Sequence, residues 1–146
     1  MSLVTGLCFF ATALSAGEMP DHVPAKVLYV KDGDTFRAIV TIWPDLSLET
    51  DVRVAHIDTP EEKRGSECEA ERQAGKLASE YAKSLLRRQQ TVFLSKIRKG
   101  KYAGRIIAEV TLPDGRDYGS AMLKAKHAIP YEGGRKRKVW CKGEKS

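Results

Sequence analysis

The stretch VPAKVLYVKDGDTFRAIVTIWPDLSLETDVRV, residues 23–54, predicts three consecutive β-strands. A first strand over 23–30 is followed by the turn sequence Asp-Gly-Asp-Thr at 32–35. Apolar and polar side chains then alternate through a second strand, and the Pro-Asp pair at 44–45 separates it from a third. We expect the last two strands to form a hairpin with Arg53 on one face of the third strand. The opposite face of that strand would carry Leu46, Leu48, Thr50, Val52 and Val54.

The rest of the chain adds one clear helix and two more strands. Ser66-Glu67-Cys68-Glu69 has the spacing of a helix capping box. Strands are predicted over 91–97 and 105–112, the second with Arg105 facing outward, and a short helix over about 119–125. The order β-β-β-α-β-β-α predicts an α+β, mainly β, fold: a five-stranded OB-fold barrel with two or three helices. The first helix is supported by apolar residues at helical spacing: Ala70, Ala74, Leu77, Ala78, Tyr81, Ala82 and Leu85.

Composition allows a single domain with a basic surface. The 146 residues suit one hydrophobic core, and 25 Lys and Arg outnumber 19 Asp and Glu, which gives a net charge of +6. A positive potential attracts polyanions such as nucleic acid or anionic lipid. Charge alone does not choose between these partners.

The amino-terminal segment has the pattern of a signal peptide. An apolar run from Leu3 to Leu14 precedes Ala-Leu-Ser-Ala, which ends at Ala16, and the first basic residue is Lys26. The run is too short to cross a bilayer, and small residues at this spacing suit a signal peptidase. We predict a signal peptide over 1–16 and a domain over 17–146. A buried amino-terminal strand or an incomplete start is the alternative, because no Lys or Arg precedes the run.

Cysteine usage is consistent with export. Removal of the segment that contains Cys8 would leave Cys68 and Cys141 in an oxidising compartment, where they could pair. A bridge between them would contribute on the order of 4 kcal/mol. The alternative is two free thiols in a cytosolic protein.

Two strand ends carry carboxylates. Asp32 and Asp34 lie in the first turn, and Asp58-Thr59-Pro60-Glu61 follows the third strand. If these loops meet, Asp34 and Asp58 supply the hard oxygen ligands that calcium prefers. Zinc is not expected, because the three histidines are scattered along the chain. Each motif alone is more often a structural turn than a site.

The motifs together resemble the staphylococcal nuclease family. Asp-Gly-Asp-Thr at 32–35, Val-Arg-Val-Ala-His-Ile-Asp-Thr-Pro-Glu at 52–61 and Lys-Tyr-Ala-Gly-Arg at 101–105 occur in the order and spacing of that family. The similarity extends from about Val23 to Trp140 and implies an OB-fold core. Ala103 is an insertion relative to the Tyr-Gly-Arg of the family prototype.

The resemblance implies a role for each motif residue. Planar guanidinium groups suit the charge that develops on phosphate oxygens, and a carboxylate can accept or orient a proton of the attacking water. Lys101 and Tyr102 would bind a terminal phosphate, and Tyr131 would stack on a base. The implied catalytic residues are Arg53, Glu61 and Arg105, and the implied calcium ligands are Asp34, Asp58 and the carbonyl of Thr59.

The expected function is a secreted or periplasmic nuclease of low sequence specificity. The resemblance implies one Ca²⁺ ion, DNA and RNA as substrates, preferably single-stranded, and 3′-phosphate products. We expect a monomer without stable membrane association. Two alternatives stay open: an OB-fold module that binds single strands without cutting them, and an envelope protein that binds another anionic polymer.

Overall fold

A computed structural model describes residues 21–63, 65–134 and 139–141. Most of these residues form a closed barrel of five strands in the order β1-β2-β3-β6-β5. The strands are β1 (Val23–Asp32), β2 (Thr35–Trp43), β3 (Leu46–Val54), β5 (Thr91–Lys99) and β6 (Arg105–Thr111). The predicted signal peptide and its cleavage site lie outside the described residues.

The barrel is a meander of three strands closed by a hairpin. β2 pairs antiparallel with both β1 and β3, and β5 pairs antiparallel with β6. Two further ladders close the barrel, a parallel one between β3 and β6 and an antiparallel one between β1 and β5. The predicted α+β class and OB-fold-like barrel are therefore confirmed.

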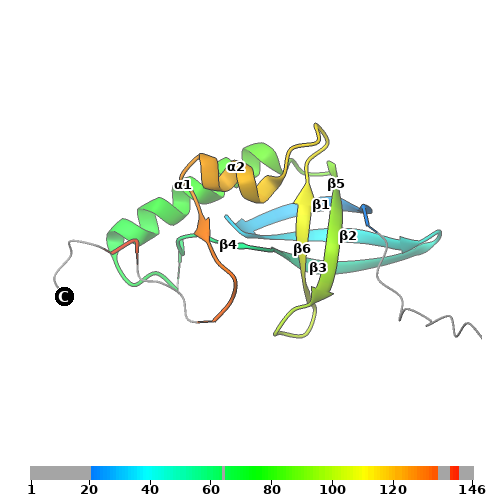
Figure 1. Cartoon of the computed structure of the whole chain (residues 1–146), viewed down its shortest axis with the longest axis horizontal. Coiled ribbons are helices and arrows are strands. Elements are labelled where there is room, and N and C mark those ends of the chain that lie inside the picture. The colour runs from blue at the N-terminus through cyan, green and yellow to red at the C-terminus, as the bar shows by residue number, and fades with distance from the viewer. Residues whose placement is uncertain (1–20, 64, 135–138, 142–146) are drawn as a thin grey trace, which may run out of the picture.

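Two helices lie together at one end of the barrel (Figure 1). α1 (Glu69–Leu85) packs against β1, and α2 (Tyr118–Lys124) packs against β6 and α1. Two short strands, β4 (Ile57–Asp58) and β7 (Ile129–Pro130), pair antiparallel beside them. The core between barrel and helices contains the fully buried side chains Val27, Phe36, Val52, Leu94, Val110 and Met122.

The start of α1 differs from the predicted capping box. The N-cap is Cys68, whose sulfur accepts a hydrogen bond from the Glu71 N–H, and the Glu71 carboxylate accepts one from the Glu67 N–H at 2.7 Å. The cap of α1 is thus Cys68, and the Glu71 carboxylate accepts from the residue before the cap. Ser66 instead donates its hydroxyl to the Lys63 carbonyl. The sequence pattern selected the usual hydroxyl cap, two residues too early.

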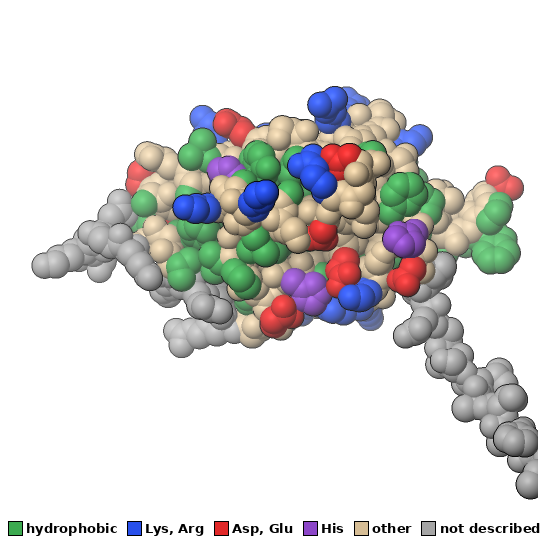
Figure 2. Space-filling model, turned by 45° about the horizontal axis from the view of Figure 1, so that its top comes forward, with side chains coloured by type: hydrophobic (Ala, Val, Ile, Leu, Met, Phe, Trp, Pro, Cys, Tyr) green, Lys and Arg blue, Asp and Glu red, His purple; other side chains and the backbone are tan. Residues whose placement is uncertain are grey.

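The β2–β3 hairpin extends beyond the barrel, to the right in Figure 1. Its outer residues have no second layer to cover them, so Trp43 is 72% exposed and Leu46 is 57% exposed. Leu48 is also exposed, and the expected apolar face of β3 is therefore buried only from Thr50 onward. Apolar side chains are visible at this end of the surface in Figure 2. Within the described residues, every helix is too short or too polar to cross a membrane.

Candidate active site

The two acidic loops meet at the end of the barrel nearest α1. The turn between β1 and β2 lies so close to the segment after β4 that a Cβ on Gly33 would lie 2.9 Å from the Thr59 side chain. Glycine is therefore required here for close approach. The phenol of Tyr118, fully buried in α2, donates a hydrogen bond to the Gly33 carbonyl at 2.7 Å. Burial raises the pKa of Tyr118 well above its ordinary value, so the phenol remains a donor.

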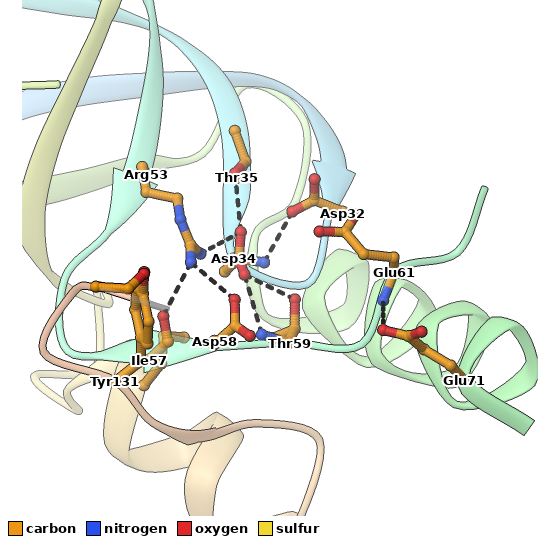
Figure 3. A network of polar contacts seen from close by, with 11 residues as sticks. Asp32, Asp34, Thr35, Arg53, Ile57, Asp58, Thr59, Glu61, Glu71 and Tyr131 are labelled. Atoms are coloured by element: carbon orange, nitrogen blue, oxygen red, sulfur yellow. Dashed lines mark hydrogen bonds and ion pairs between the residues drawn. The ribbon is translucent and has the colours of Figure 1, made fainter. Parts of the chain in front are cut away.

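Asp34 is the centre of the hydrogen-bond network in Figure 3. Its Oδ2 accepts both the backbone N–H of Thr59 at 3.0 Å and the Thr59 hydroxyl at 2.9 Å. Its Oδ1 accepts the hydroxyl of Thr35 at 2.9 Å. Asp34 is only 6% exposed, so these three donors fix the orientation of a buried carboxylate.

Arg53 joins Asp34 to Asp58. One terminal nitrogen of its guanidinium forms an ion pair with Asp34, and the other lies 3.1 Å from Asp58 Oδ1 and 3.2 Å from the Ile57 carbonyl. The side chains of Asp34 and Asp58 are 8% and 3% exposed, and that of Arg53 is 14% exposed. Arg53 lies on the outward face of β3, and its side chain lies between Asp34 and Asp58. These two carboxylates and one guanidinium carry more negative than positive charge.

Asp32 and Glu61 extend this acidic cluster toward α1 (Figure 3). Asp32 Oδ1 accepts the Asp34 N–H at 3.0 Å. Burial, and after it the charge of Asp34, raises the pKa of Asp32 to about 7, with a smaller contribution from the charge of Glu61. The negative charges of Asp32, Asp34 and Glu61 repel one another, and a bound cation would offset this repulsion.

The donors in the cluster fit a hard cation. Asp32, Asp34 and Asp58 offer carboxylate oxygen atoms only, which is the chemistry that calcium prefers. His56 precedes Asp58 by two residues, but its ring nitrogens contact Glu132 at 2.9 Å and Glu109 at 3.3 Å instead. Among the described residues, Cys68, Glu71 and Cys141 also lie together, but the two sulfur atoms are 2.10 Å apart, at disulfide distance, and unavailable as thiolates.

Three further predicted site residues lie together at the start of β6. Lys101 and Tyr102 lie in the loop before β6, and the Arg105 guanidinium is stacked over the Tyr102 ring at 4.7 Å. Cross-strand pairing places Arg105 opposite Asp51, two residues before Arg53 on the neighbouring strand.

Tyr131 lies near Arg53, beside Ile57 (Figure 3). Its backbone N–H donates to the His56 carbonyl at 3.0 Å, directly after the pairing of β7 with β4. Its hydroxyl donates to the Gly134 carbonyl at 2.7 Å. The ring is half-buried and borders the cluster. The hydrogen bonds of its backbone N–H and of its hydroxyl fix its orientation.

Comparison with known proteins identifies the family. The sequence model of the staphylococcal nuclease homologues matches residues 51–141. The chain belongs to this family. An Escherichia coli protein described as an uncharacterized endonuclease is 29% identical over 110 residues, which are 75% of this chain and 62% of that protein. The chain thus spans less than two thirds of the length of this relative.

The staphylococcal nuclease homologue match begins after the first acidic loop. It includes Arg53, Asp58 and Glu61, whereas Asp34 precedes it. The contacts from Thr59 and Arg53 to the Asp34 carboxylate join this earlier residue to the matched region. Asp34 therefore belongs to the same site as the matched residues, although it lies outside the matched part of the sequence.

Several residues around this nuclease-homologue site were not predicted from the sequence. Thr35 and Tyr118 orient the first acidic loop. Glu71 accepts the backbone N–H of Glu61 at 3.4 Å. A glutamate in the first turn of a helix is ordinarily a dipole or capping residue, so only its burial distinguishes Glu71.

Proposed function

We propose that this protein is a calcium-dependent phosphodiesterase that hydrolyses DNA and RNA with low sequence specificity. The observation that carries the proposal is the ion-pair network of Asp34, Arg53 and Asp58 in a staphylococcal nuclease homologue. Its buried carboxylates can hold a cation, and its guanidinium can bind phosphate.

The proposed calcium ligands are Asp34, Asp58 and the Thr59 carbonyl. A bound calcium ion would supply positive charge against the negative charge that develops on the phosphate oxygens. Arg53 is preorganised between the two carboxylates by three contacts. We propose that it donates to a nonbridging phosphate oxygen once the charges of Asp34 and Asp58 are offset.

Glu61 is proposed to accept or orient a proton of the attacking water. It lies close enough to Asp32 for its charge to raise the pKa of that carboxyl, which places it at the edge of the acidic cluster. A carboxylate there can direct water toward a phosphorus held near Arg53. Cleavage of the bond between phosphorus and the 5′ oxygen would leave a 3′-phosphate.

The substrate strand is proposed to cross the face between Tyr102 and Tyr131. Tyr102 is 60% exposed, with Lys101 and Arg105 at its ring, and can hold a terminal phosphate. The Tyr131 ring can stack on an unpaired base. These contacts are with the phosphate backbone and with the flat face that every base has, so we propose single strands of DNA or RNA as substrates. We propose Arg105 as a second catalytic arginine.

We also propose export to the periplasm or the exterior, with cleavage after Ala16 and a monomeric mature domain over 17–146. The proximity of the Cys68 and Cys141 sulfur atoms supports an oxidising compartment. Non-reducing peptide mapping of the exported protein should recover these two cysteines in one linked fragment.

The test incubates purified protein with single-stranded DNA and with RNA, in calcium and separately in a chelator, and resolves the products by size. We expect degradation that requires calcium and falls steeply in Glu61→Ala. Glu62→Ala is the matched control, because it removes a neighbouring carboxylate without touching the proposed site. The ends of the products should carry 3′-phosphates.

The same experiment separates cutting from binding. Intact substrate that shifts on a native gel would contradict the proposal and indicate an OB-fold module that binds single strands. Binding of an acidic polysaccharide that nucleic acid does not displace would indicate an envelope protein instead.

A further inference from the structure

The carboxylate of Glu71 holds both ends of the segment that leads from Glu61 into α1. Its Oε1 accepts the Glu61 N–H at 3.4 Å, and its Oε2 accepts the Glu67 N–H at 2.7 Å. Glu71 is buried, with 9% exposure. A buried carboxylate is costly unless its hydrogen bonds are made, so this position requires both donors.

Gly75 provides the close contact that goes with these hydrogen bonds. A Cβ at this position would lie 2.6 Å from the Glu61 carbonyl carbon and 2.7 Å from the Glu62 nitrogen. Both contacts are with backbone, which cannot rotate aside. Because residues four apart share one face of a helix, Glu71 and Gly75 form a single surface under Glu61. We call these two residues the Glu61 seat.

The seat is anchored at the start of α1 by the cysteine pair. Cys68 caps the helix by accepting the Glu71 N–H at 3.3 Å. The sulfur of Cys141 lies 3.9 Å from Glu71 Oε2. The pair thus joins the first turn of α1 to a segment 73 residues later, next to the carboxylate that holds Glu61.

We infer that Glu71 and Gly75 are positioning residues that fix the Glu61 backbone, and through it the Glu61 carboxylate, at the acidic cluster. The inference rests on the proposed function and adds two residues to it that touch neither substrate nor metal. A shift of about 1 Å in a reacting group can lower a rate about 100-fold. A seat that holds backbone therefore affects turnover more than substrate binding.

The test compares Glu71→Gln and Gly75→Ala with wild type in the full chain. Gln keeps one acceptor oxygen but turns an NH₂ toward a backbone donor, so one of the two bonds is lost. We expect kcat to fall about tenfold or more with KM within about twofold. Alanine is the better helix former, so Gly75→Ala should lower kcat while retaining helix content. Glu80→Gln, on the exposed part of the same helix, is the control.

A double-mutant cycle distinguishes positioning from general structural support. In a Glu61→Ala background, Glu71→Gln should cause no further loss of residual cleavage, because the carboxylate that the seat positions is gone. A second readout needs no catalysis: hydrogen exchange at the Glu61 and Glu67 amides should be at least about tenfold faster in Glu71→Gln.

The outcomes separate the inference from the proposed function. Unchanged kcat in Glu71→Gln, or an equal loss in both Glu61 backgrounds, would overturn the inference while leaving the nuclease intact. A wild-type protein that fails to cut would overturn the proposed function. Unchanged exchange at the Glu61 amide would then refute the seat on structural grounds alone.

Discussion

Replacement of Arg53 by methionine tests how much the charge of its guanidinium stabilises the buried carboxylates of the acidic cluster. Methionine keeps much of the packing of the side-chain stem and removes the charge. The variant leaves the carboxylates of Asp34 and Asp58, 8% and 3% exposed, without their shared counter-charge. Removal of one partner from a buried ion pair costs about 3–5 kcal/mol. For a domain of this size that loss lowers Tm by on the order of 15 °C.

Urea unfolding at pH 8 in a chelator measures this loss, with Arg37→Met as the control. Arg37 also bridges two carboxylates, Glu49 and Asp51, but at a more exposed position where ion pairs contribute about 1 kcal/mol or less. Calcium should stabilise the Arg53 variant, by about 2.7 kcal/mol at 100 times its Kd if only the folded state binds. Equal losses in the two variants, or no effect of calcium on Arg53→Met, would refute the reasoning.

Three further predictions concern the scaffold. Cys68→Ser combined with Cys141→Ala keeps a side-chain cap on α1 but opens the loop between two residues 73 positions apart. Urea unfolding should show a free energy of unfolding lower by about 4 kcal/mol. The wild-type protein should show the same decrease only after reduction. Tyr118→Phe leaves a buried carbonyl in the first acidic turn unpaired and should cost about 1–3 kcal/mol; a smaller loss would indicate that water replaces the phenol. The hydrogen bond from Lys96, and after it their charge attraction, lowers the pKa of Glu109 below its ordinary 4.5, so the pair stabilises the fold above that pH and less as pH falls through the lowered pKa. Lys96→Met should therefore differ from wild type at neutral pH and converge with it in acid, and a constant difference would contradict the assignment.

The strands of the barrel were predictable because their pattern is local. Alternation of apolar residues and the breaks at 32–35 and 44–45 define strands that pair with their sequence neighbours. The exposed Trp43 and Leu46 show the limit of that pattern, since alternation does not reveal where the second layer of the fold ends. The extent of burial along β3 depends on the position of elements far away in sequence.

The candidate site was predictable only where motifs carry it. The spacing around Asp34 and Asp58 indicated two acidic loops, and the structure brings them together through Thr59 and Arg53. Glu71 gave no signal beyond that of an ordinary helix-start glutamate. The need for glycine at position 75 likewise arises from contact with backbone fourteen residues earlier in the chain, which propensity and spacing do not encode.

The catalytic role of Arg105 remains a prediction. Its guanidinium is stacked on the Tyr102 ring, and its place relative to a bound phosphate is untested. Arg105→Lys keeps the charge but loses the planar fork, so a large fall in kcat would support phosphate binding in the transition state.

The most direct test of the central claim is the initial rate of single-stranded DNA cleavage during a calcium titration, for wild type and for Asp58→Asn. We expect no cleavage in chelator, saturation of the wild-type rate with calcium, and a calcium midpoint at least about tenfold higher in the variant, because an amide is a weaker ligand than a carboxylate. Cleavage that persists without divalent cations, or the same calcium midpoint in both proteins, would contradict the assignment of the acidic cluster as a metal-dependent active site.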